Sequence, residues 1–221
     1  MTTRIKGRKN DDLLTKKAGE ARFPTIMILD STGDPLLTIT RATASTWGRA
    51  GLPVSVYAEK LDACERYVAL KSRAAAGDTS VKVDLAVAGV RIGKLDVEKL
   101  DKAVAGVDLT PEQAGVVAQA RANATCERLV ARMRGRYIPA EQKRIVDALL
   151  GLYRAGTHPN SDSASTYWWV VARRGQETGD VAMMEAGRKG IRAAPERAWQ
   201  FKAFLDQLEK DLEARKAASG G

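Results

Sequence analysis

The second half of the chain constrains the fold most, because its segments after Thr110 have the apolar spacing of helices and not the alternation of strands. Thr110, Pro111 and Gln113 supply a capping box, which predicts a helix from there to about Arg134. Four further helices are predicted, over 139–153, 165–174, 180–193 and 195–216. Apolar helix stripes become buried by packing on one another, so we expect a helical bundle over 107–216 and a disordered tail over 217–221.

Residues 23–106 mix strand and helix patterns. Two apolar runs, 23–29 and 36–40, flank a turn-forming cluster and predict a β-hairpin. Helices are predicted over 42–50, 54–76 and 95–105. The alternation over 80–87 indicates a half-buried strand, with 90–92 as its hairpin partner. The expected fold class is therefore α+β and predominantly α: a small N-terminal α/β unit with β-hairpins and a helix pair, then an all-helical bundle.

The charge balance points to an acidic partner. The 221 residues include 36 Lys and Arg against 27 Asp and Glu, a formal net charge of +9. Hydrophobic residues at 44% and charged residues at 29% are typical of a globular protein and exclude wholesale disorder. No apolar run approaches the roughly 20 residues of a membrane-spanning helix, and the N-terminus lacks the apolar stretch of a secretory signal. Cys64 and Cys126 are isolated in the sequence, so we expect reduced thiols and a cytoplasmic setting.

Three arginines of the predicted helix 110–134 lie on one face. Arg121, Arg128 and Arg132 are seven and four residues apart, a spacing that places their guanidinium groups on one stripe. The opposite face is apolar and consists of Cys126, Leu129, Val130, Met133 and Tyr137. A guanidinium group donates two hydrogen bonds to a phosphate at once, so we expect the stripe to bind phosphates. The same prediction includes the basic residues that follow, Arg134, Arg136, Lys143 and Arg144. The alternative is a solvated helix whose arginines pair with Glu112, Glu127 or Glu141.

A second basic segment, residues 1–22, has little apolar content and is predicted to be a flexible arm. We expect it to order on the phosphate backbone of a nucleic acid. The alternative is a solvated arm without a partner. The basic residues in this prediction are Arg4, Lys6, Arg8, Lys9, Lys16 and Lys17.

The segment over 43–57 resembles a helix-turn-helix. Its centre, residues 49–55 (RAGLPVS), has a glycine at the turn after a short helix and a small polar residue where a second helix starts. Trp47 and Tyr57 depart from the motif, which has a small residue and a branched aliphatic residue at those positions. The resemblance implies that Arg49, Ser55 and Lys60 contact DNA. An α-hairpin with a Gly-Leu-Pro turn is the alternative.

Three adjacent aromatic residues, Tyr167, Trp168 and Trp169, stand close to Arg173 and Arg174. Aromatic side chains beside arginines stack on unpaired bases, which favours a single-stranded nucleic acid. Two adjacent tryptophans do not both face one core of a helix, so we expect at least one of them at an interface. Packing in the core is the alternative, since Trp and Tyr bury large areas.

The sequence has few features of an enzyme. His158 is the only histidine and lies in a polar loop, where we expect a solvent-exposed side chain rather than a general base. Phosphate-binding loops, dinucleotide fingerprints and nucleophile motifs are absent from the sequence. We therefore expect no catalytic residue, no cofactor, no metal site and no small-molecule substrate.

The function predicted from these features is non-catalytic binding of DNA or RNA through arginine-rich helix faces and the basic arm. The alternative is a structural subunit of a larger nucleoprotein or viral assembly. In that case the basic faces and the two tryptophans would contact other protein subunits or further copies of this chain. Neither interpretation involves a membrane.

Overall fold

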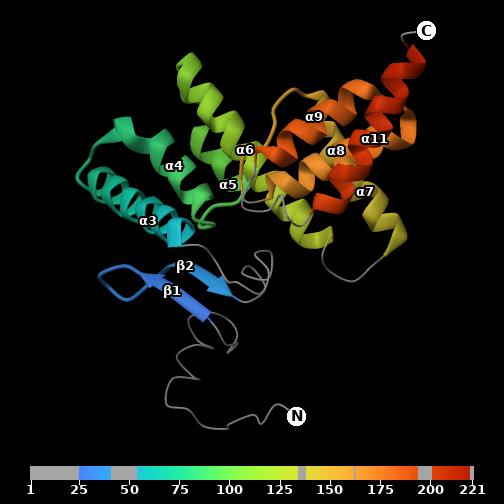
Figure 1. Ribbon diagram of the computed structural model, residues 1–221. Coiled ribbons are helices and arrows are strands. Elements are labelled where there is room, and N and C mark those ends of the chain that lie inside the picture. The colour runs from blue at the N-terminus through green and yellow to red at the C-terminus, as the bar shows by residue number, and fades with distance from the viewer. Residues whose placement is uncertain (1–24, 41–53, 134–137, 162, 194–200, 220–221) are drawn as a thin grey trace, which may run out of the picture. The chain divides into compact units, whose positions relative to one another are not determined.

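The computed structural model describes residues 25–40, 54–133, 138–161, 163–193 and 201–219. The chain divides into two compact units, Met1–Val107 and Asp108–Gly221, and the predicted boundary near Gly106 lies next to this division. The described residues contain eight α-helices, one short 3-10 helix and one two-stranded antiparallel sheet (Figure 1). The protein is therefore a predominantly helical α+β protein, as the sequence predicts.

The predicted N-terminal hairpin is confirmed. Strands β1 (Thr25–Leu29) and β2 (Pro35–Thr40) pair antiparallel, with Ile26 opposite Ile39. Asp30 closes the turn, because its Oδ1 accepts hydrogen bonds from the Thr32 backbone N–H at 3.0 Å and the Asp34 backbone N–H at 2.9 Å. The Thr32 hydroxyl also donates to Asp30 Oδ1, at 2.6 Å, and this bond, together with the backbone bonds, holds the pKa of the Asp30 carboxyl below its usual range.

Helix α3 (Val54–Ala75) covers one side of the hairpin, and α4 (Lys82–Arg91) and α5 (Val97–Val104) complete this unit. Leu36 of β2, Cys64 of α3 and Ile92 after α4 form one buried cluster, so the hairpin and the helices share a core. A second cluster consists of Leu70, Val81 and Ala88 and joins α3 to α4. The hairpin thereby gains the packing partner that an isolated two-stranded sheet needs.

The second predicted hairpin, over 80–87 and 90–92, is wrong. Thr79–Val81 forms the 3-10 helix η2, and α4 follows it directly. Asp78 caps η2, since its Oδ1 accepts hydrogen bonds from both the backbone N–H and the hydroxyl of Ser80. Val83, Ala86 and Val90 are buried three and four residues apart, which is helical spacing. Over so short a segment the apolar residues fit both periods, and the cap and packing on α3 select the helix.

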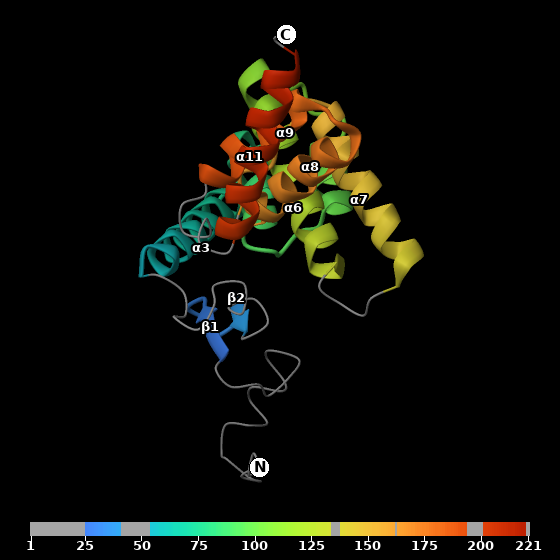
Figure 2. The ribbon, with the colours of Figure 1, turned by 45° about the vertical axis from the view of Figure 1, so that its right-hand side comes forward.

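The second unit consists of five described helices, matching the predicted number: α6 (Pro111–Met133), α7 (Pro139–Arg154), α8 (Ala164–Thr178), α9 (Val181–Arg192) and α11 (Lys202–Ser219). Helix α8 contacts the four others and lies between α7 and the pair α9–α11 (Figures 1 and 2). The predicted capping box of α6 is present, because Thr110 and Gln113 exchange hydrogen bonds of 3.1 and 3.2 Å.

Two helices extend beyond their predicted ends. Helix α8 continues to Thr178 and stops at Gly179, whose φ of +77° is the left-handed conformation of a helix C-cap. Helix α11 continues to Ser219, so residues 217–219 are helical rather than part of a disordered tail.

The core of this unit consists of two clusters that share α8. Tyr167, Val170 and Val171 of α8 pack with residues of α6 and α7 in the first cluster. Ala172 of α8 packs with Met184 and Ile191 of α9 and with leucines of α11 in the second. The approach of α8 to α9 is close: a Cβ atom on Gly187 would lie 2.7 Å from the backbone nitrogen of Ala172. A Cβ atom on Gly190 would meet the ring of Trp168.

Candidate nucleic-acid interface

Helix α6 has one apolar face and one arginine face, as its sequence predicts. Cys126, Leu129 and Val130 are buried in the first core cluster. Arg121, Arg128 and Arg132 are exposed. With a rise of about 1.5 Å per residue, Arg128 and Arg132 are about 6 Å apart along the helix axis. We call these three residues the arginine stripe.

Helix α7 brings a carboxylate and two further cations to the end of this stripe. The Nε and Nη2 atoms of Arg132 donate hydrogen bonds to Glu141 Oε1, at 3.1 and 2.7 Å. Lys143 and Arg144 are exposed, and Arg144 lies one helical turn beyond Glu141 on the same side of α7. The pairing with Glu141, which the sequence suggests only as the alternative to phosphate binding, is therefore real for Arg132. Arg128, by contrast, has no ion pair or hydrogen bond with any residue that the structure describes.

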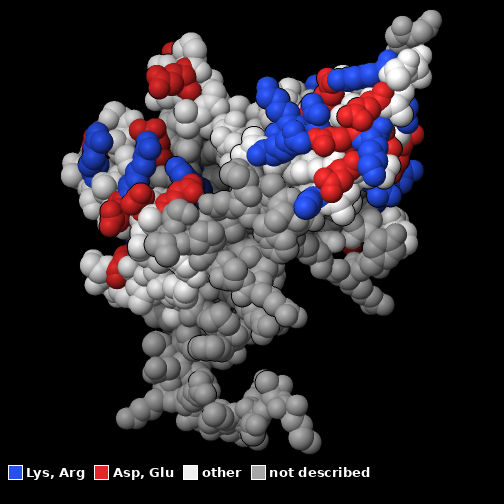
Figure 3. All heavy atoms as spheres, viewed as in Figure 1, with Lys and Arg blue, Asp and Glu red and all other residues white. Residues whose placement is uncertain are grey.

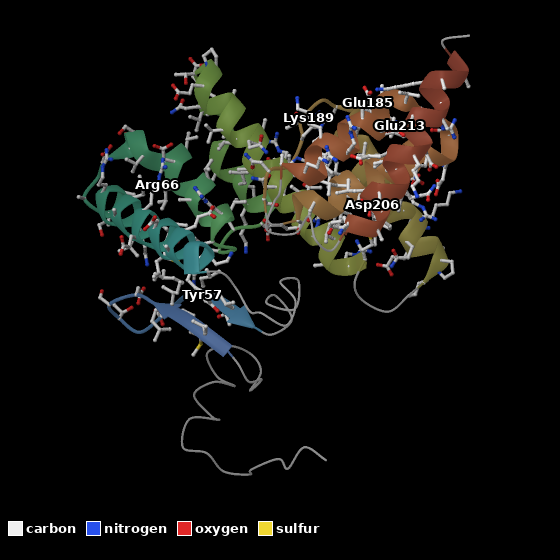
Figure 4. All side chains as sticks on the ribbon, in the orientation of Figure 1. Tyr57, Arg66, Glu185, Lys189, Asp206 and Glu213 are labelled. Carbon is white, nitrogen blue, oxygen red and sulfur yellow. The ribbon has the colours of Figure 1, made fainter. Side chains whose placement is uncertain are left out.

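Ion pairs join the charged residues of α9 to those of α11. Arg188 and Arg192 both pair with Glu209. Lys216 Nζ lies 2.5 Å from Glu185 Oε1, and this contact holds the pKa of the Glu185 carboxyl below its usual range. Basic and acidic residues accordingly adjoin one another over α9 and α11 in Figure 3. Figure 4 shows Glu185 and Lys189 on α9, and Asp206 and Glu213 on α11.

The sequence itself shows the contrast with the stripe. The segment from Arg121 to Arg144 contains seven arginines and lysines but only two acidic residues, Glu127 and Glu141. Its excess of five positive charges is more than half of the formal net charge of the whole chain. Positive charge is therefore concentrated in this segment, which includes Arg134 and Arg136 outside the described residues, whereas several cations of α9 and α11 are paired with carboxylates.

Arg173 and Arg174 lie outside the stripe, on α8. Both pair with Glu177: Arg173 Nε is 3.6 Å and Arg174 Nη1 is 3.3 Å from its carboxylate. One carboxylate thus compensates two guanidinium groups, and both arginines remain about half exposed.

The aromatic residues of α8 pack inside the helical unit. Tyr167 is fully buried, and Trp168 and Trp169 are half-buried against both core clusters. Both tryptophans pack inward because α8 has helices on two sides, a situation that the sequence argument does not consider. This arrangement agrees with core packing, the alternative interpretation, and leaves less ring surface for stacking on bases.

The prediction of a solvent-exposed His158 is wrong. Its Nδ1 lies 3.0 Å from the Tyr167 hydroxyl, and its ring stacks on Tyr153 with 5.6 Å between centroids. Burial raises the pKa of the Tyr167 hydroxyl well above its ordinary value of 10.0. His158 therefore belongs to the aromatic packing between α7 and α8. These contacts join residues from different helices, so no local sequence pattern indicates them.

A polar cluster fixes the loop that contains His158 to α6. Asn123 and Asn160 exchange hydrogen bonds of 2.8 and 2.9 Å, and Gln119 Nε2 donates to the carbonyl oxygen of His158 at 2.9 Å. Gln119 and Asn123 are one turn apart on α6. Sequence reasoning did not identify these residues, because amides on a helix have no distinctive spacing.

Several predicted binding residues lie outside the described part of the chain. They are Arg4, Lys6, Arg8, Lys9, Lys16 and Lys17 of the arm, Arg49 of the segment that resembles a helix-turn-helix, and Arg134 and Arg136. Ser55 is in the first turn of α3, and Lys60 is partly exposed on the same helix. The structure thus brings together only the α6 and α7 part of the predicted interface.

A search for family models, curated proteins and solved structures similar to this chain finds no match in any of the three classes. Among the described helices, none combines the length and apolar character needed to cross a bilayer. The described residues also contain no cluster of three or more His, Cys, Asp or Glu side chains that is suited to hold a metal ion.

Proposed function

We propose that the protein is a non-catalytic, cytoplasmic nucleic-acid-binding protein whose arginine stripe, with Lys143 and Arg144, contacts the phosphate backbone. The observation that carries this proposal is the two-sided character of α6. Its apolar face is buried in the core, and its exposed arginine face includes Arg128, which has no acidic partner among the described residues. Buried free thiols at Cys64 and Cys126 support a reducing compartment.

The contrast with α9 and α11 supports a binding role over a merely solvated surface. On those helices cations and carboxylates pair with each other, as expected where charge serves solubility. In the segment from Arg121 to Arg144 the cations outnumber the carboxylates by five. The cations of this segment repel one another in the free protein. A bound polyanion relieves that repulsion, and its condensed counterions are released into solution.

The proposed contacts carry little sequence information. Guanidinium groups on an exposed helix face reach phosphates, which are the same at every nucleotide. Affinity should therefore depend steeply on salt and weakly on sequence. The aromatic residues of α8 are not part of this proposal, because the core already holds them.

A pair of matched variants tests the proposal. Replacing Arg121 and Arg128 with Ala removes two phosphate contacts and should lower the slope of log K against log salt by about 1.8 for a duplex. The same calculation gives a loss of affinity of about 60-fold at 0.1 M salt. The control replaces Lys202 and Lys210 of α11, two exposed cations that carry the same total charge.

Fluorescence anisotropy with labelled single-stranded and duplex DNA and RNA of mixed sequence provides the measurement. The control variant should keep a slope close to that of the original protein, because its lysines lie outside the proposed interface. Equal losses in the two variants would indicate general charge attraction and exclude a defined stripe. Failure of the original protein to bind any of these probes at low salt would exclude the proposed function.

A structural subunit of a larger nucleoprotein or viral assembly is the second candidate. Exposed apolar side chains in the N-terminal unit favour it: Ile26 is 42%, Leu29 45% and Leu61 46% exposed. Apolar groups at a surface contribute to association when another chain covers them. Light scattering over a wide range of protein concentration tests this candidate, since a subunit gains mass with concentration and a monomeric binding protein does not.

A further inference from the structure

Arg132 differs from Arg128 of the arginine stripe because an acidic side chain already occupies its guanidinium group. Both hydrogen bonds come from the Nε–Nη2 edge of the guanidinium group and end on Glu141 Oε1. This edge is one of the two edges with which an arginine binds a phosphate through two hydrogen bonds. The carboxylate of Glu141 therefore stands where a phosphate oxygen would bind.

We propose that Glu141 acts as a built-in competitor for phosphate at Arg132 and sets the affinity and selectivity of the stripe. This inference rests on the proposed function. In the free protein Glu141 neutralises Arg132, so the pair contributes no net charge to the attraction of a polyanion. A phosphate gains the Nε–Nη2 edge of Arg132 only by displacing Glu141.

The structure indicates that this displacement is feasible. The side chains of Arg132 and Glu141 are 57% and 33% exposed, so water solvates both partners and the pair is weak. Exposed ion pairs typically contribute about 0–1 kcal/mol. Arg132 and Glu141 also come from different helices, the last turn of α6 and the first turn of α7, so neither backbone needs to move when the pair opens.

The same geometry predicts selectivity for densely charged ligands. Glu141 is tethered beside Arg132 at a high effective concentration, which an isolated phosphate ion in solution does not match. A nucleic acid held at Arg121 and Arg128 presents its next phosphate to Arg132 at a similarly high effective concentration. Glu141 thus discriminates against single anions and leaves binding of a polyphosphate chain possible.

Replacing Glu141 with Gln tests this role, because Gln keeps the size and a hydrogen-bonding oxygen but removes the negative charge. We expect one additional phosphate contact, seen as a slope of log K against log salt that is steeper by about 0.9 for a duplex. At 0.1 M salt this corresponds to an affinity gain of about eightfold, which disappears toward 1 M salt. The probes are the labelled oligonucleotides used for the stripe, with the full chain.

Asp147→Asn is the matched control. Asp147 is an exposed carboxylate on the same helix, and it has no ion pair or hydrogen bond with the described residues. Its replacement removes the same charge, and we expect an affinity change of less than about twofold, because a single uncoupled surface charge is screened by salt. A second control repeats Glu141→Gln in an Arg132→Ala background, where the gain should vanish.

The outcomes separate this inference from the proposed function. Binding by the original protein together with no gain, or a loss, in Glu141→Gln would overturn the competitor role and leave the function standing. An equal gain in Asp147→Asn, or a gain that persists without Arg132, would also overturn it, since the effect would then be general electrostatics. Absence of binding in both the original protein and Glu141→Gln at low salt would overturn the function and the inference together.

Discussion

Replacing Gly187 with Ala should destabilise the second unit, because α8 and α9 touch at this glycine. An added Cβ atom would lie 2.7 Å from the backbone nitrogen and 2.8 Å from the Cα atom of Ala172. Ordinary contacts at such positions are 3.4–4 Å, so the two helices must separate by more than half an ångström. The obstructing atoms are the Cβ and backbone atoms of Ala172, and an alanine has no side-chain torsion whose rotation could relieve the clash.

The size of the effect follows from two opposing contributions. Overpacking of a dense core costs about 1–3 kcal/mol, and we expect the upper end of that range because backbone atoms must move. Alanine in place of glycine stabilises a helix by about 1 kcal/mol. The net loss is about 2 kcal/mol. For a unit of 114 residues, this corresponds to a decrease in melting temperature of about 8 °C.

Gly151→Ala is the matched control, because Gly151 is also inside a helix, α7, and an added Cβ atom there meets nothing within 4 Å. This variant should be more stable than the original protein by up to about 1 kcal/mol. Thermal and urea unfolding, followed by tryptophan fluorescence, provide the measurement, since Trp168 and Trp169 lie in the affected core. A melting temperature of Gly187→Ala at or above that of the original protein would refute the close contact of α8 and α9.

Two predictions concern the buried titratable groups. Cys64 and Cys126 are 2% and 0% exposed, and burial raises the pKa of the Cys64 thiol, so a thiol reagent should label neither residue until the protein unfolds. Rapid labelling of one thiol in the folded protein would contradict this burial. Burial also raises the pKa of the Tyr167 hydroxyl, so the folded state keeps a proton that the unfolded state releases above its ordinary pKa of 10.0. Stability should therefore fall as the pH rises past about 10, and Tyr167→Phe should weaken that dependence; an unchanged dependence in the variant would exclude Tyr167 as its cause.

Sequence patterns predict the arginine helix well because all the information is local. The spacing of Arg121, Arg128 and Arg132 determines one exposed stripe, and the structure places the apolar residues of α6 on the other side. The ion pair between Arg132 and Glu141 is less predictable. It depends on how α6 and α7 pack, and the sequence indicates only that Glu141 is one of several candidate partners.

Two wrong predictions have the same origin. The segment over 80–92 contains apolar residues compatible with either period, and only packing on α3 and the cap at Asp78 select a helix. His158 lies in a polar loop, yet its ring packs with Tyr153 of α7 and Trp168 of α8. These rings come together only because α7 and α8 pack against each other. In both cases a tertiary contact decides the outcome, and a local pattern does not contain it.

The central position of α8 has a consequence for how this protein tolerates change during evolution. Residues of α8 belong to both core clusters, so a substitution on this helix must suit partners on both of its sides. The exposed charged residues of α6 and α11 belong to neither cluster, and their ion pairs lie at the surface. Selection can therefore alter the charge of either outer face with little effect on the core, while the helix between them preserves the architecture on which both faces depend.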